Sequence, residues 1–465
     1  MKELTQEYTT SPSPKKSKAS WYQAVWRWHF YAGLFAAPFL LILAFSGGVY
    51  LFKPQIEGML YQEQFTVNEM GSQVLAPASI TAAVQERYPD AAISAYKVYE
   101  EADRTVEVGV VDNGVAKSVY VNPYNGDVQG ELIASEKFTE IFKKLHSELI
   151  VGGTFANRLV ELAACWTIIL LLTGLYLWWP RKLKSIWGIV LPRFNARGRT
   201  FWRDLHAVPA FWFSIMIVIL IATGLPWSGI MGEQINKLAT STNSGYPAFA
   251  HSFGEKPAST LRAEEVAEDV PWASQNDAVP VSAVGEYQTI SLDDVSMIAS
   301  MENVAKPYTI SMPMGEEGVY TIATSHSVPW DNATIHLDQY SGGVLSDVRF
   351  ADYGIMAQGI TAGIALHEGR LFGWLNQALG LLTCLAIIGI VISSFVMWRK
   401  RKPDGLGAPK KPISKKASRT VFILMIAGGI LMPLVGVSIL AVVLVDYLVV
   451  KKIPAVHKWF HGKAA

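Results

Sequence analysis

The chain has 465 residues, a formal net charge of +1, 51% apolar residues and 15 tryptophans, and its mean hydropathy is positive. This composition indicates a membrane protein rather than a large soluble enzyme, and the near-zero charge gives no basic surface for nucleic acid. Cys165 and Cys384 are the only cysteines and both lie in apolar runs, so a disulfide framework, a four-ligand zinc site and a CxxCH haem attachment are excluded.

Five apolar runs are candidates for membrane spans, since about 20 helical residues cross about 30 Å of hydrocarbon. In chain order we predict first a cytoplasmic tail (1–28), a first span (29–52), an outer domain (53–154), a second span (155–179) and a cytoplasmic loop (180–204). The second half repeats this order with a third span (205–231), a second outer domain (232–366), a fourth span (367–398) and a cytoplasmic loop (399–419). A fifth span that is kinked or re-entrant (420–450) and a basic tail (451–465) follow.

The distribution of Lys and Arg gives the orientation of these spans. Basic residues cluster before the first span, between the second and third, and after the fourth, so these three segments are predicted to be cytoplasmic. The first apolar run is too long for a signal peptide and no convincing cleavage site follows it, so it is expected to be retained. A hairpin at Pro433 in the last run would give two arms that are each too short to cross, and the side of the C-terminus is left open.

An internal repeat organises the chain. The first span has His29 followed by Ser46, and the third has His206 followed by Thr223, with an offset of seventeen residues in both (46 − 29 and 223 − 206). The second and fourth spans match as well, through the series His146, Asn157, Cys165 and Thr173 and the series His367, Asn376, Cys384 and Ser393. The first and third spans begin at the cytoplasmic side, so His29 and His206 are predicted at the inner face and His146 and His367 at the outer face.

The two outer segments also repeat. Residues 120–128 and 336–344 each read as a strand, an Asn or Asp turn with Gly, and a second strand, and Ser79–Tyr88 reads as a helix. The predicted fold class is therefore a membrane α-helical bundle with two extracytoplasmic α+β domains. Its two tandem copies would be related by a pseudo-two-fold axis along the membrane normal.

Four histidines at matched positions suggest a redox site. The axis would bring His29 to His206 and His146 to His367, and two opposed imidazoles are what a six-coordinate haem iron needs. A single interfacial histidine is usually structural, and a proton relay is an alternative use of the four. Zinc or copper would lack ligands at two histidines. Small residues near the four histidines would leave room for a flat macrocycle: Gly33, Ala36, Ala37, Ala207, Ala210, Gly359 and Gly363.

Other polar residues are weaker candidates. His251, His326 and His336 lie in the second outer segment without counterparts in the first, and we expect them to be solvated. Arg158 and Arg370, near the outer helix ends, could pair with haem propionates or extend to the membrane interface.

Several short motifs resemble the PepSY-associated transmembrane family, also known as iron-regulated membrane proteins. They are Trp28–Gly33, Thr173–Arg181, Arg203–His206 and Leu366–Gly373, and the turns at 121–128 and 337–344 look like the ends of PepSY domains. The resemblance covers nearly the whole chain, and together these short motifs are specific. One departure is Ala207, where family members often have Arg after the histidine, which removes one expected propionate contact.

The resemblance implies a ferric-siderophore reductase of a bacterial inner membrane with periplasmic domains. It would carry two haem b groups, one held by His29 and His206 and one by His146 and His367. A ferric siderophore or ferric chelate would be the acceptor. Quinol or a separate reductase would be the donor, because no flavin or nicotinamide motif is present. Two alternatives stay open: an iron or siderophore permease component, and a membrane-anchored PepSY binding module without redox activity.

Overall fold

The computed structural model describes residues 15–180, 186–246, 259–283, 288–324, 328–401, 406–409 and 415–461. The chain divides into two compact units. We call them the helical unit (Met1–Ala44, Phe155–Ile221 and Leu385–Ala465) and the sheet unit (Phe45–Thr154 and Ala222–Cys384).

The helical unit contains long apolar helices. Its elements are α1 (Lys15–Tyr50), α6 (Gly153–Trp178), α7 (Arg199–Trp212), α8 (Ser214–Gly224), α13 (Gly373–Arg401), α14 (Lys415–Leu431), α15 (Pro433–Val445), a π-helical turn (Asp446–Val450) and α16 (Pro454–His461), of which α1, α6, α8 and α13 continue into the sheet unit. Among the described residues, four helical segments are long and apolar enough to span a membrane, and α7 with α8 would make a fifth.

The third predicted span is bent. Helices α7 and α8 meet at 59° across Phe213, where we had expected one continuous helix. At the break, the hydroxyl of Ser214 donates to the carbonyl of Phe211 at 2.8 Å. Pro209, four residues before Phe213, has no backbone N–H to donate. A proline inside a helix and a side chain that enters the backbone hydrogen-bond ladder are both recognised causes of a kink.

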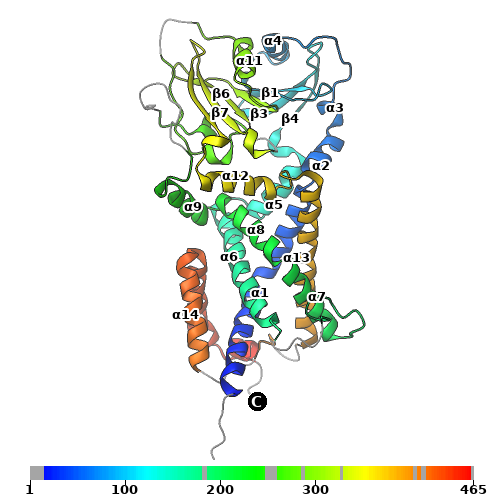
Figure 1. Cartoon of the computed structure of the whole chain (residues 1–465), viewed down its shortest axis with the longest axis vertical. Coiled ribbons are helices and arrows are strands. Elements are labelled where there is room, and N and C mark those ends of the chain that lie inside the picture. The colour runs from blue at the N-terminus through cyan, green and yellow to red at the C-terminus, as the bar shows by residue number, and fades with distance from the viewer. Residues whose placement is uncertain are drawn as a thin grey trace, which may run out of the picture. The chain divides into compact units, whose positions relative to one another are not determined.

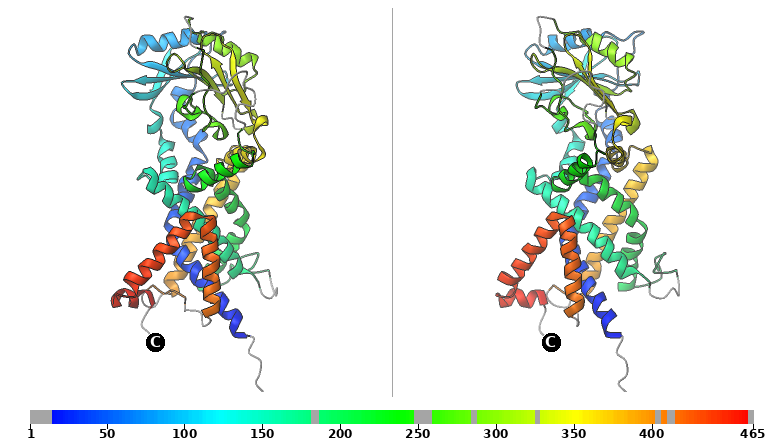
Figure 2. Two further views of the ribbon diagram at one scale, coloured as in Figure 1. Left: turned by 90° about the vertical axis from the view of Figure 1, so that its left-hand side faces the viewer. Right: turned by 60° about the vertical axis from the view of Figure 1, so that its left-hand side comes forward.

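The fifth apolar run forms two helices that meet at Pro433. Figure 2 shows α14 and α15 leaving this turn at an acute angle. Gly429 and Gly436 allow the close approach, because a Cβ at Gly429 would lie 2.7 Å from the Cα of Gly436. We had expected both arms of a hairpin at Pro433 to be too short to cross the membrane. This is wrong for the second arm, because Pro433–Val450 is an 18-residue helical segment that is long enough to span.

The sheet unit is built on one eight-stranded antiparallel sheet with the order β4-β3-β2-β1-β5-β6-β7-β8. Its strands are β1 (Ala92–Val98), β2 (Val106–Asp112), β3 (Val115–Val121), β4 (Val128–Leu132), β5 (Tyr308–Ser311), β6 (Val319–Thr324), β7 (Ala333–Asp338) and β8 (Val344–Arg349). Two separate outer domains are not confirmed, because β1 pairs with β5, with Tyr96 opposite Ile310, and joins strands from both segments into one sheet.

In the described part of this unit, eight α-helices lie wholly within it: α2 (Lys53–Leu60), α3 (Gln62–Phe65), α4 (Pro77–Arg87), α5 (Phe138–Glu148), α9 (Ile230–Ser241), α10 (Ala263–Val266), α11 (Leu292–Met301) and α12 (Ile355–His367). Helices α4 and α11 lie together over the sheet (Figure 1) and bury Ile80, Val84 and Val295 in a shared core with strand residues such as Val108 and Ile322. The predicted helix at 79–88 is thereby confirmed as α4.

The two predicted strand turns are confirmed, and they have the same construction. Asn122 accepts a hydrogen bond from the amide of Tyr124 at 2.9 Å, and Asp338 accepts one from the amide of Tyr340 at 3.0 Å. Gly126 then takes a positive φ of 82°, a conformation that glycine adopts without steric cost. Gly342 does the same at 71°.

Candidate functional site

The first pair of predicted histidines comes together inside the helical unit. His29 on α1 and His206 on α7 have ring centroids 6.4 Å apart, with the ring planes at 87°. A metal–imidazole bond is about 2 Å long and a ring nitrogen lies about 1.1 Å from the ring centre, so two axial imidazoles on one iron would have centroids about 6.2 Å apart. The observed separation agrees with that requirement.

Hydrogen bonds fix which ring nitrogen of each histidine is available. His206 Nδ1 lies 2.9 Å from the carbonyl oxygen of Ile390, which can only accept, so Nδ1 carries the proton. His29 Nδ1 lies 2.8 Å from Thr173 Oγ1, and the Thr173 hydroxyl donates to the carbonyl of Ile169 at 2.7 Å. The Thr173 oxygen is therefore an acceptor for His29. In both rings Nε2 keeps its lone pair for a metal.

A cavity of about 1280 Å³ adjoins this pair and has both histidines in its wall. Four of the small residues singled out from the sequence also line it: Gly33, Ala37, Ala207 and Ala210. Since ligand sites usually measure about 300–1,000 Å³, the space is sufficient for a large flat group. Ala36 is fully buried and does not line the cavity.

Arginines give the cavity a positive rim. Asp204 is 1% exposed and holds Arg193 in a bidentate pair at 2.7 and 2.8 Å, and it also accepts from Arg203 at 2.9 Å. Arg401 is different, because its buried Nε has no hydrogen-bond partner among the described residues. An unsatisfied guanidinium nitrogen in the cavity wall is suited to an anionic group such as a propionate.

The second pair comes together in the sheet unit. His146 on α5 and His367 on α12 have centroids 6.1 Å apart and ring planes at 73°. His146 Nδ1 lies 3.2 Å from Ser46 Oγ, and His367 Nδ1 lies 3.1 Å from Thr223 Oγ1. Both histidines precede the spanning helices in the structure. His367 ends α12, whereas the sequence prediction had it begin the fourth span, which starts as α13 at Gly373.

A hydroxyl residue followed by glycine supports three of the four imidazoles. At Gly47, Gly174 and Gly224, an added Cβ would lie 3.0, 3.2 and 3.3 Å from the Cε1 of His146, His29 and His367 respectively. The preceding residues, Ser46, Thr173 and Thr223, are the ones that reach Nδ1. In the sequence these hydroxyls only align the repeats, and no role was predicted for them. The signal was the shared offset of seventeen residues for Ser46 and Thr223, and the matched order of residues in the second and fourth spans for Thr173.

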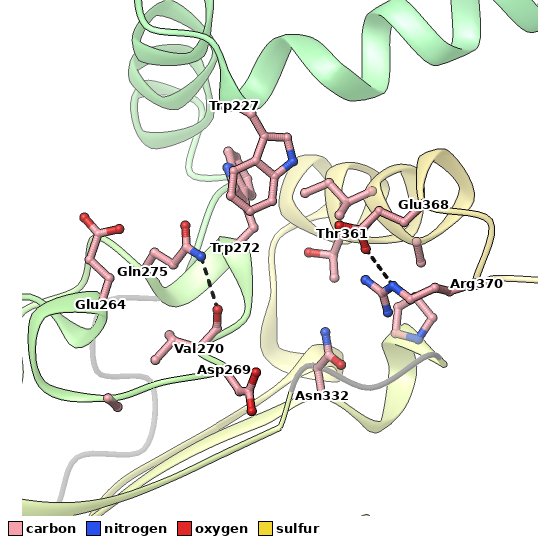
Figure 3. Close-up of a pocket in the computed structure, with 14 residues that line it drawn as sticks. Trp227, Glu264, Asp269, Val270, Trp272, Gln275, Asn332, Thr361, Glu368 and Arg370 are labelled. Carbon is pink, nitrogen blue, oxygen red and sulfur yellow. Dashed lines mark hydrogen bonds and ion pairs between the residues drawn. The ribbon is translucent and has the colours of Figure 1, made fainter. Parts of the chain in front are cut away.

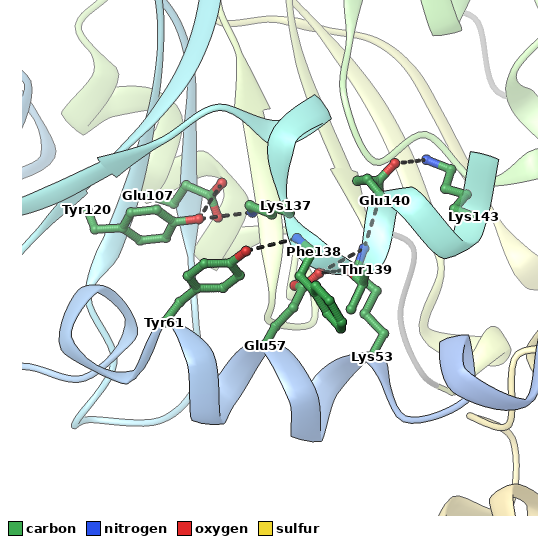
Figure 4. A network of polar contacts seen from close by, with 10 residues as sticks. All are labelled: Lys53, Glu57, Tyr61, Glu107, Tyr120, Lys137, Phe138, Thr139, Glu140 and Lys143. Atoms are coloured by element: carbon green, nitrogen blue, oxygen red, sulfur yellow. Dashed lines mark hydrogen bonds and ion pairs between the residues drawn. The ribbon is translucent and has the colours of Figure 1, made fainter. Parts of the chain in front are cut away.

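A polar network holds the helix that carries His146 (Figure 4). The hydroxyl of Thr139 on α5 donates to the carboxylate of Glu57 on α2, and the amide of Phe138 donates to the hydroxyl of Tyr61 at 2.9 Å. Glu57 is 7% exposed, so this contact lies in the interior. The network fixes the start of α5 and thereby the position of His146 further along the same helix.

Two secondary predictions change. His336 was expected to be solvated, but it lies on β7 with 4% exposure, bonds Thr321 at 2.9 Å, and has its pKa lowered to about 4 by burial. His251 and His326 lie outside the described residues. Arg370 forms an ion pair with Glu368 at 2.6 Å, and Arg158 lies 3.6 Å from Glu161, so each has a carboxylate partner.

The donor set suits a haem better than a bare ion. Among the described residues, no group of three or more His, Cys, Asp or Glu side chains is placed to hold a metal. Two imidazoles leave a free metal ion short of ligands, whereas a porphyrin supplies the other four nitrogens itself. The matched separations, the Nδ1 partners and the roomy inner cavity all fit that group.

The spanning helices and the antiparallel sheet define a multi-pass membrane protein with an α+β region. A family model for the PepSY-associated TM region matches residues 26–401. The chain belongs to the PepSY-associated transmembrane family. No curated protein matches it.

Proposed function

We propose that this protein is a two-haem electron-transfer protein of a bacterial inner membrane that reduces ferric iron or a ferric siderophore on the periplasmic side. The observation that carries the proposal is the approach of four histidines in two pairs, at 6.4 and 6.1 Å between ring centroids. In each pair both rings have a hydrogen-bond partner at Nδ1, which leaves Nε2 for a metal.

A haem b bound by each pair would exchange one electron at a time between ferric and ferrous iron. The chain's part is to hold the rings. Thr173 and the Ile390 carbonyl set the tautomer at the inner pair, and the glycines beside the hydroxyl residues let the rings lie close to the helix backbone. Arg401 and Arg199, both in the cavity wall, would neutralise the carboxylates of the inner group.

A tandem repeat accounts for the paired arrangement. Helix α4 is followed by the four strands β1–β4, and α11 is followed by β5–β8, so each half of the sheet has the same element order. The seventeen-residue spacing from histidine to hydroxyl also occurs in both halves. We interpret these likenesses as a pseudo-two-fold relation in which each copy gives one histidine to each pair.

The acceptor and the donor follow from the same scheme. Oxygen chelators hold ferric iron more tightly than ferrous iron, so one-electron reduction outside the membrane would release it from a siderophore. The basic segments before α1 and after α13 would face the cytoplasm, and the sheet unit would face the periplasm. Quinol or a separate reductase would supply the electrons.

Haem content tests the proposal. Protein purified from haem-replete cells should contain two haems per chain by pyridine haemochromogen assay, and His146→Ala and His367→Ala should each lower this to about one, because one of two bis-histidine sites is lost. His336→Ala is the control, since this imidazole lies in the same unit and bonds a threonine hydroxyl through Nδ1 but belongs to neither pair. A haem-free preparation, or full haem content in both site variants, would refute the assignment. Reoxidation of the dithionite-reduced protein by ferric siderophores tests the acceptor.

A further inference from the structure

A second cavity, of about 310 Å³, lies within the sheet unit (Figure 3). Its wall contains two indoles, three carboxylates and one guanidinium: Trp227, Trp272, Glu264, Asp269, Glu368 and Arg370. The volume is at the lower end of the range for ligand sites, so an occupant would be a small molecule.

One side chain in this wall calls for a ligand. Thr361 on α12 is 6% exposed, and its Oγ1 has no hydrogen-bond partner among the described residues. In Figure 3 the hydroxyl points into the cavity. An unsatisfied buried hydroxyl costs about 1–3 kcal/mol, and nearly all such groups in folded proteins have a partner. A polar molecule in the cavity would supply that partner.

The charges in the wall favour a cation. Glu368 and Arg370 neutralise each other at 2.6 Å, and Asp269 pairs with Lys97 and accepts from the Thr309 hydroxyl at 2.8 Å. Glu264 is left without an ion pair in the described part of the chain, and it gives the cavity a net negative charge. Indole rings attract cations through their electron-rich faces, and Trp is the strongest of the aromatic side chains in this respect.

We propose that this cavity binds a small organic cation through its ammonium group. Glu264 would attract the positive charge, and Trp227 and Trp272 would contact the ammonium group. The Thr361 hydroxyl, which has no partner among the described residues, would accept a hydrogen bond from one of its N–H groups. An organic cation fits better than a metal ion, since no cluster of three metal-ligating side chains occurs among the described residues. The inference goes beyond the proposed redox function and needs no haem, so the two can fail independently.

Binding to the intact protein tests the proposal. Isothermal titration of the full chain in lipid nanodiscs should show saturable binding of 1,5-diaminopentane and none of glutarate, a dianion of similar length. Glu264→Gln should weaken diamine binding about tenfold, because a charge-assisted contact is lost. Thr361→Val, which preserves the side-chain shape, should weaken it about threefold.

Glu233→Gln is the matched control. This glutamate is also in the sheet unit, its side chain is 64% exposed, and it does not line the cavity. The Glu233→Gln variant should bind 1,5-diaminopentane with the affinity of the wild type. No detectable heat with 1,5-diaminopentane, equal binding of glutarate, or unchanged affinity in both cavity variants would overturn the proposal. Glu264 is on an exposed four-residue helix, so its substitution is not expected to impair folding.

Discussion

The hydroxyl of Thr173 is the contact whose removal tests the inner site most selectively. Thr173 Oγ1 accepts from His29 Nδ1 at 2.8 Å while its own proton goes to the Ile169 carbonyl at 2.7 Å. Thr173→Val keeps the branched shape of the side chain but leaves the Nδ1–H of the His29 imidazole without this acceptor. The ring can then rotate or change tautomer, and Nε2 is no longer reserved for iron.

The expected loss follows from what such contacts contribute. Removing a hydrogen-bond partner of a metal-bound histidine usually lowers metal affinity 10–100-fold, which corresponds to about 1.4–2.8 kcal/mol. An unpaired buried donor costs a similar amount, about 1–3 kcal/mol. The hydrogen bond makes the imidazole a better electron donor, which favours ferric over ferrous iron. If a tenfold loss falls on the ferric form alone, the inner midpoint potential rises by about 59 mV.

Potentiometric titration and the haem-to-protein ratio measure these changes. Thr167→Val is the matched control, because Thr167 lies on the same helix, lines the same cavity and donates to the carbonyl of Ala163 at 2.7 Å, yet no hydrogen bond joins it to an imidazole. The reasoning is refuted if Thr173→Val keeps the wild-type haem content and both wild-type potentials, or if the two variants behave alike.

Two further predictions concern the sheet unit. Gly47→Ala should displace the ring of His146, since the new Cβ would lie 3.0 Å from Cε1, and should lower the haem content to about one per chain. Gly58→Ala, at a glycine with open space, should leave it unchanged, and equal content in both variants would count against the proposed outer site. Burial raises the pKa of Asp277 from 3.8 to about 7, so the folded state binds its proton more tightly and the free energy of unfolding falls as pH rises between these values. Asp277→Asn should therefore raise Tm more at pH 8 than at pH 5 in thermal denaturation, and an equal gain at both would contradict this.

The spans and the histidine pairs could be predicted because both leave a pattern along the sequence itself. Apolar length identifies a span, and a constant offset such as that from His29 to Ser46 identifies a repeat. The bend at Phe213 could not be predicted in the same way. The Ser214 hydroxyl bonds the Phe211 carbonyl at the break and Pro209 lies four residues before Phe213, but a serine or a proline alone does not identify a bend, since α1 continues past Pro38.

The joining of the two outer segments into one sheet was also beyond the sequence. Strands β1 and β5 each show their own strand pattern, but nothing in either specifies that Tyr96 lies opposite Ile310. Pairing between strands so far apart in the chain depends on edge exposure and shared core packing. For the same reason His336 was misjudged, because its burial comes from the neighbouring strands and not from its own residues.

The recurring offset of seventeen residues acquires a physical meaning from the contacts. On α1, His29 faces His206, while Ser46 on the same helix bonds His146 of the other pair. Seventeen residues make about 4.7 helical turns, and on any α-helix the insertion of one residue between two positions would turn one of them by about 100° relative to the other. In the third span His206 on α7 faces His29, while Thr223 on α8, beyond the break at Phe213, bonds His367 of the other pair. Each copy of the repeat therefore supplies an imidazole to one pair and a hydroxyl support to the other, from a single helix in α1 and from two helices in the third span.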